Sequence, residues 1–134
     1  MHKTYNTPLS QKLGIKEGST LIVINSPANY TATLGKLPVG ASVSKTPQTN
    51  SELIQFFAKS REELVKKLKE IKPYLSPAGA LWISWPKKTS HIQTNLDESF
   101  VMGEGLKSGL VDVKVTKVDE DWSALKFVFR LKDR

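Results

Sequence analysis

The chain has 134 residues, a length typical of one domain, so we predict a single domain over residues 1–134. Hydrophobic residues make up 39% and charged residues 25% of the sequence, which excludes an intrinsically disordered chain. The absence of cysteine excludes a disulfide scaffold, a thiolate zinc site and a cysteine nucleophile. The only histidines are His2 and His91, and we therefore expect no metal site.

The chain is basic, with 20 Lys and Arg against 13 Asp and Glu and a formal net charge of +7. Such an excess favours polyanionic partners, namely nucleic acid, a phosphorylated ligand or an acidic protein. The alternative is a charge that serves solubility alone, which the predominance of lysine over arginine favours. No apolar run approaches the roughly 20 residues of a membrane span. The first residues also lack the apolar stretch of a signal peptide, so we expect a cytoplasmic protein without membrane contact.

The first part of the chain is predicted to alternate short helices with strands. A hydroxyl residue precedes proline at Thr7-Pro8 and at Ser26-Pro27, a pattern typical of a capped helix start. The second of these starts predicts a short helix over residues 28–34. Residues 20–24 form a continuous apolar run typical of a strand buried on both faces, and residues 41–45 predict a weaker strand.

The middle of the chain contains the clearest helix signal. After an apolar strand predicted over residues 53–58, Ser60 and Glu63 form a capping box, in which each side chain accepts a bond from an exposed backbone amide. Pro73 should weaken the last turn of the helix that follows. The apolar stripe of the helix after Ser60 consists of Leu64, Leu68, Ile71 and Leu75. A third buried strand is predicted over residues 80–85.

The last third of the chain predicts a helix and a hairpin. Thr94 or Asn95 is expected to cap a helix that ends near Ser108, and its glycines weaken it by about 1 kcal/mol each relative to alanine. Two strands of alternating character follow, and the acidic turn at residues 119–121 connects them as an antiparallel hairpin. The alternation predicts that one face of the first of these strands carries Val111, Val113 and Val115.

Together these elements predict an α/β fold. Strands that are apolar throughout and alternate with helices indicate a mostly parallel sheet covered on both faces, with right-handed crossovers. We therefore expect a three-layer α/β/α, Rossmann-like architecture with about five to six strands, to which the C-terminal hairpin adds an antiparallel strand.

This order of elements resembles the class I methyltransferase-like Rossmann fold. Residues 13–24 resemble the lead-in and first strand of that fold, and residues 50–54 the strand that follows its cofactor region. Residues 71–83 are similar to the entry into its fifth strand, and residues 109–113 to the turn into its sixth.

More closely, the chain is similar to a bacterial domain-of-unknown-function family with a shortened version of this fold. Residues 82–88, 119–126 and 130–134 carry this closer similarity, which extends over nearly the whole chain. The resemblance implies the fold but no activity, because no activity is assigned to that family.

The sequence departs from the methyltransferase pattern where adenosylmethionine would bind. The loop after the first strand needs small residues that let the backbone approach the cofactor, yet residues 25–30 contain no glycine. A carboxylate at the end of the second strand would hold the ribose hydroxyls, but that strand ends at Ser44, Lys45 and Thr46. We therefore expect no cofactor, and methyl transfer is disfavoured.

Ligands of open α/β sheets bind beyond the carboxyl ends of the strands, where three segments of this chain are expected to meet. Asn25 and Ser26 lead into a helix start, Lys59 and Ser60 open the capped helix, and Trp85 precedes Lys87 and Lys88. Together they would form a positive rim beside one flat apolar surface, suited to phosphate, a nucleotide or single-stranded nucleic acid. The alternative is structural, with serines that only cap helices, a tryptophan in the core and solvated lysines.

Three functions remain open from the sequence. The favoured hypothesis is a non-catalytic binding or protein-interaction domain, which should expose an apolar patch. The second is a binder of nucleic acid, nucleotide or phosphate through the basic surface, and the third is an enzyme acting on a small anionic ligand. We predict no catalytic residue, because His91 has no carboxylate near it in the sequence and no serine lies in a nucleophile-elbow motif.

Overall fold

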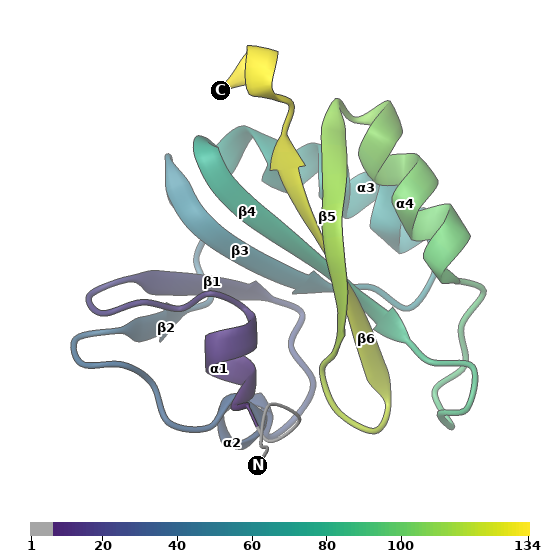
Figure 1. Ribbon diagram of the computed structural model, residues 1–134. Coiled ribbons are helices and arrows are strands. Elements are labelled where there is room, and N and C mark those ends of the chain that lie inside the picture. Colours follow the sequence, from purple (N-terminus) through teal and green to yellow (C-terminus); the bar gives the residue numbers. More distant parts are fainter. Residues whose placement is uncertain (1–6) are drawn as a thin grey trace.

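The computed structural model describes residues 7–134, so His2 lies outside the described part of the chain. Six strands form one sheet in the order β2-β1-β3-β4-β6-β5 (Figure 1). The first four strands in that order are parallel to one another, and β6 is antiparallel to both β4 and β5. The predicted α/β fold with a C-terminal antiparallel hairpin is therefore confirmed. The strands are β1 Thr20–Ile24, β2 Ser42–Ser44, β3 Ser51–Phe57, β4 Leu75–Pro86, β5 Leu110–Lys117 and β6 Trp122–Phe129.

Helices cover both faces of the sheet, with α1 and α2 on one face and α3 and α4 on the other (Figure 1). Alternate residues of each strand point to opposite faces, so β4 sends Leu81 and Ile83 towards α3 and α4 but Trp82 towards α1. No helix within residues 7–134 is long and apolar enough to cross a membrane. The helices are α1 Leu9–Lys12, α2 Tyr30–Leu34, α3 Arg61–Ile71 and α4 Glu98–Lys107, with short 3-10 turns η2 Lys72–Tyr74 and η3 Leu131–Asp133.

Helix α3 begins as predicted but ends one turn before the last residue of its predicted stripe. The Ser60 hydroxyl accepts a bond from the amide of Glu63 (3.1 Å), and the Glu63 carboxylate accepts one from the amide of Lys59 (2.8 Å). Leu64, Leu68 and Ile71 of the predicted stripe are buried, but the helix ends at Ile71 because Pro73 falls in η2, and Leu75 is the first residue of β4. A cap of this kind contributes about 1 kcal/mol, which helps to fix where α3 starts beside the sheet.

The starts of the other helices differ from prediction. Helix α1 has Pro8 at its N-cap position, and α2 starts at Tyr30 after Asn29, so the predicted start of α2 at Ser26-Pro27 lies too early in the chain. Helix α4 starts at Glu98, where the Asp97 carboxylate accepts from the amide of Phe100 (2.8 Å). In each case the N-cap position lies closer to the helix than the residue that the local pattern favoured, and of the three only Asp97 caps with its side chain.

Strand β5 also departs from its predicted alternation. Its register with β6 shifts between Asp112 and Lys114, so Val111 pairs with Val128 and Lys114 pairs with Lys126. Because Val128 and Lys126 are two residues apart on β6, both pairs lie on the face that carries α1 and α2. Val111 and Val115 therefore lie on opposite faces, and the prediction that the three valines share one face is wrong.

Candidate functional site

The predicted site segments follow parallel strands, whose carboxyl ends meet at one edge of the sheet. The structure brings two of these segments together through Glu63. The Asn25 amide donates to one carboxylate oxygen of Glu63 (3.4 Å), while the backbone amide of Lys59 donates to the other (2.8 Å). The local sequence pattern indicates Glu63 only as half of a capping box, but this residue also joins the loop after β1 to the start of α3.

The amino end of α3 is occupied by other groups of the chain. The amide of Arg61 donates to the Asn95 side chain (2.8 Å), and the Arg61 guanidinium donates to the Asn95 carbonyl (3.0 Å). The Thr94 hydroxyl adds a bond to the carbonyl of Lys59 (2.6 Å). The backbone amides of Arg61 and Glu63 at the start of α3 are therefore already used by Asn95 and Ser60.

The third predicted segment is tied to other parts of the fold. Trp85 is 5% exposed and belongs to the core beneath α3 and α4, so its ring does not form the expected flat surface. The backbone amide of Lys87 donates to the carbonyl of Asp121 (2.8 Å). Hydrogen bonding and attraction to Lys117, with a smaller contribution from Lys87, lower the pKa of Glu120 in the same turn. Lys87 and Lys88 line a shallow hollow of about 430 Å³ with residues 92–97.

A larger hollow of about 710 Å³ lies beyond β1 and β2, around α2. Asn25 and Asn29 beside it have φ angles of 59° and 64°, a left-handed conformation that glycine adopts most easily. The turn after β1 therefore has a glycine-like backbone at two positions that carry side chains. The residues that line this hollow are Val23, Ser26, Pro27, Ala28, Asn29, Tyr30, Thr31, Ala32, Leu34, Val43 and Lys45.

A buried polar chain beneath α2 was missed in the sequence. The Tyr30 hydroxyl donates to the Gln55 side-chain oxygen, and the Gln55 amide donates to the Ser84 hydroxyl (2.9 Å). The Tyr30 ring packs edge-on against Phe57, with centroids 4.9 Å apart. Burial raises the pKa of Tyr30 above its usual range, so the phenol stays protonated near neutral pH. Gln55, a lone amide inside an apolar strand, is the sequence signal that could have revealed this chain.

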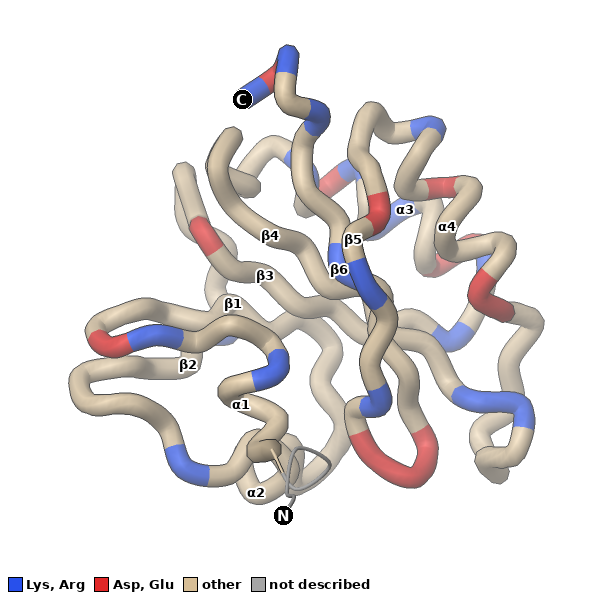
Figure 2. The backbone as a smooth tube through the Cα atoms, viewed as in Figure 1, with Lys and Arg blue, Asp and Glu red and all other residues tan. Residues whose placement is uncertain are grey.

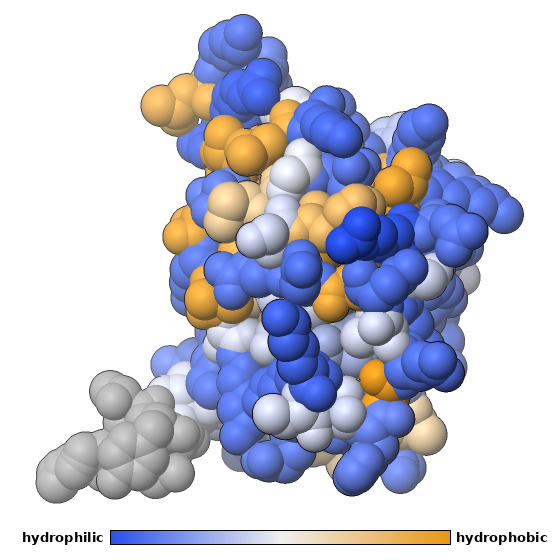
Figure 3. Space-filling model, turned by 90° about the vertical axis from the view of Figure 1, so that its right-hand side faces the viewer, coloured by the Kyte–Doolittle hydropathy of each residue, from blue (hydrophilic) through white to orange (hydrophobic). Residues whose placement is uncertain are grey.

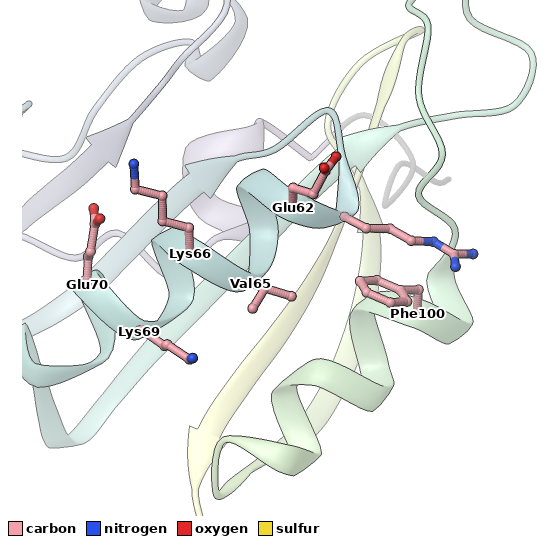
Figure 4. A pocket seen from close by; sticks show the side chains of 7 residues that line it. Glu62, Val65, Lys66, Lys69, Glu70 and Phe100 are labelled. Atoms are coloured by element: carbon pink, nitrogen blue, oxygen red, sulfur yellow. The ribbon is translucent and has the colours of Figure 1, made fainter.

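A groove of about 820 Å³ lies between α3 and α4, and its lining begins at Arg61, the residue after the predicted site residue Ser60 (Figure 4). Val65 and Phe100 supply apolar surface, and the Arg61 guanidinium lies 4.6 Å from the centre of the Phe100 ring. Lys66, Lys69, Glu62 and Glu70 complete the lining.

Further apolar surface lies on the side of the molecule that carries α4 and β5, where it forms several pieces separated by hydrophilic groups (Figure 3). Among the exposed apolar side chains are Leu106, Val113 and Val115. Within residues 7–134, no group of three His, Asp or Glu side chains is arranged to hold a metal ion.

No family model matches the sequence, and no curated protein matches it. Solved structures do match. A SAM dependent methyltransferase from Aquifex aeolicus superposes with a TM-score of 0.61 at 15% identity, over 87% of this chain and 85% of that chain. A ribosomal protein L11 methylase from Lactobacillus delbrueckii subsp. bulgaricus gives a TM-score of 0.54 at 11% identity, over 90% of this chain and 74% of that chain.

A putative type 11 methyltransferase from Sulfolobus solfataricus gives a TM-score of 0.52 at 13% identity, over 82% of this chain and 84% of that chain. At such identities these likenesses establish the fold alone. The chain has a methyltransferase-like, Rossmann-like α/β fold.

Proposed function

We propose that this protein is a non-catalytic binding domain that acts through protein interaction and has lost the adenosylmethionine site of the fold it resembles. The lining of the hollow beyond β1 and β2 carries this proposal. The charged side chain in this lining is that of Lys45, which directly follows β2. In a nucleotide-binding site of this fold, a carboxylate at the end of the second strand would accept hydrogen bonds from the ribose hydroxyls. An ammonium group donates hydrogen bonds but accepts none, so Lys45 cannot replace that carboxylate. Among the described lining residues there is no Asp or Glu.

The turn after β1 supports the same proposal. In a nucleotide site of this type, small residues let the backbone approach the ligand closely. Here Asn29 projects a side chain from the turn, and the next residue, Tyr30, is anchored to Gln55 by its hydroxyl. Opening this turn for a cofactor would break a buried hydrogen bond and the ring contact with Phe57.

The groove between α3 and α4 supports the binding half of the proposal. Its apolar lining surface around Val65 and Phe100 would be covered by an apolar side chain of a partner protein. The surrounding side chains of Lys66, Lys69 and Arg61 outnumber the two glutamates, which favours an acidic neighbour on that partner. Membership of the bacterial domain-of-unknown-function family and residence in the cytoplasm remain predictions from the sequence.

Calorimetric titration with adenosylmethionine and adenosylhomocysteine, alongside thermal melts, tests the loss of the cofactor site. We expect no saturable heat and no shift of the melting temperature at millimolar ligand. A ligand present at 100 times its Kd would add about 2.7 kcal/mol to the free energy of unfolding, which a melt detects readily. An active methyltransferase of the same fold is the positive control. Saturable binding of either compound would refute the proposal.

A further inference from the structure

The face of the sheet that carries α1 and α2 also carries a row of lysines, which we call the lysine strip and define as Lys16, Lys114 and Lys126. Lys114 of β5 lies directly opposite Lys126 of β6, and Lys126 lies opposite Trp82 of β4. The two lysines are therefore neighbours in a row that crosses the strands. The blue segments of β5 and β6 lie side by side at the centre of the view in Figure 2.

The chain after α1 completes the strip. Trp82 is fully buried, and its indole N–H donates to the carbonyl of Leu13 (3.0 Å), so this segment lies against the same row. The Lys114 ammonium lies 5.9 Å from the centre of the Trp82 ring. Lys16, three residues after Leu13, is close enough for its charge to lower the pKa of Lys126. Lys114 and Lys126 therefore lie in one row across the strands, and the segment that carries Lys16 packs beside it.

The charge of the strip is not neutralised by acidic side chains. Burial lowers the pKa of Lys126, and repulsion from Lys114 and then from Lys16 lowers it further, with no carboxylate contributing. Like charges directly opposite each other on paired strands destabilise a sheet. The ion pairs found within residues 7–134 leave all three lysines out. They are Lys67–Glu70, Lys107–Glu104 and Lys117–Glu120.

We propose that the lysine strip binds the sugar–phosphate backbone of a nucleic acid without sequence preference. Lys114 and Lys126 stand on neighbouring strands, which are about 4.8 Å apart, a spacing comparable with the roughly 3.4 Å per phosphate of one DNA strand. A lysine ammonium contacts a phosphate as a point charge and reads no base. The aromatic ring of the row, Trp82, is buried and cannot stack on a base. The strip lies over β5 and β6, whereas the hollow beside α2 lies beyond β1 and β2, and the inference goes beyond the proposed function.

Fluorescence anisotropy with a labelled 16-base-pair duplex of random sequence tests the inference. Three phosphate contacts give a slope of log K against log salt of about −2.7, equivalent to a loss of about 40-fold in affinity between 50 and 200 mM salt. The double variant Lys114→Gln, Lys126→Gln should lose about two units of this slope. The matched control, Lys67→Gln with Lys107→Gln, removes the same charge from α3 and α4 on the opposite face and should keep the slope.

Two further measurements complete the design. Circular dichroism and urea unfolding establish that both double variants fold, and a polyglutamate chain of equal charge serves as a competitor. Absence of duplex binding at low salt, or an equal loss in both double variants, would overturn the inference. Binding of polyglutamate in place of the duplex would also overturn it and assign the strip to an acidic protein. None of these outcomes depends on the adenosylmethionine titration, so the two proposals fail independently.

Discussion

Two glycines of α4 offer a sharp test of the packing described above. A Cβ atom added at Gly105 would lie 2.6 Å from Cδ1 of Phe127 and closer still to its Cε1. Phe127 is fully buried in the core beneath α3 and α4, so its ring has no free space to enter. A Cβ atom added at Gly103 of the same helix would meet nothing within 4 Å.

The variants Gly105→Ala and Gly103→Ala therefore separate helix propensity from packing. Both substitutions gain about 1 kcal/mol because alanine loses less backbone entropy than glycine in a helix. Only Gly105→Ala also overpacks the core, which costs about 1–3 kcal/mol in typical cases and occasionally more. We expect Gly103→Ala to be more stable than the parent protein, and Gly105→Ala to be less stable than Gly103→Ala by the packing cost.

Urea unfolding, followed by circular dichroism, measures both effects. The urea concentration at the midpoint of unfolding should be higher for Gly103→Ala than for the parent protein, and lower for Gly105→Ala than for Gly103→Ala. The slope m of the free energy against urea should be unchanged if both variants keep the two-state transition. The difference between the two midpoints, multiplied by m, gives the packing cost directly. Equal midpoints for the two variants would show that α4 does not sit against Phe127 as described.

Two other substitutions test the polar chain and the lysine strip. Tyr30→Phe leaves the buried Gln55 oxygen without its donor and should cost about 1–3 kcal/mol in urea unfolding, whereas Tyr74→Phe, at a more exposed tyrosine, should change little. Equal effects of these two changes would contradict the polar chain. Lys126→Gln should stabilise the protein at neutral pH, because the folded state lowers the pKa of Lys126 and so disfavours its charged form. This gain should shrink as the pH rises towards the ordinary lysine pKa, and a gain independent of pH would refute the electrostatic explanation.

Local sequence patterns predicted the strands and α3 because their signals lie within a few residues. The run at residues 20–24 and the capping pair Ser60 and Glu63 need no distant partner to be recognised. Strand β4 was predicted only from residue 80, whereas it starts at Leu75. Its early pairing with Ser51 is a long-range contact that propensity does not report.

The candidate site was less predictable because its residues are fixed by distant contacts. Asn95 was expected to cap α4, yet its side chain accepts from the amide of Arg61 at the start of α3. Trp85 was a candidate for the crevice, but strand parity with Leu81 and Ile83 places it in the core, as the structural alternative anticipated. The register shift that aligns Lys114 with Lys126 is a property of the pairing between β5 and β6. The alternating sequence of β5 gives no sign of it.

The register shift in β5 also bears on how the molecule ends. A regular edge strand offers a ladder of free backbone groups on which a neighbouring chain can continue the sheet. Here β5 is interrupted between Asp112 and Lys114 and carries a second cation at Lys117, while β2 at the far edge is only three residues long. Both edges of the sheet therefore disfavour strand pairing between molecules. This protects a chain whose strands are rich in valine and isoleucine from forming fibrils.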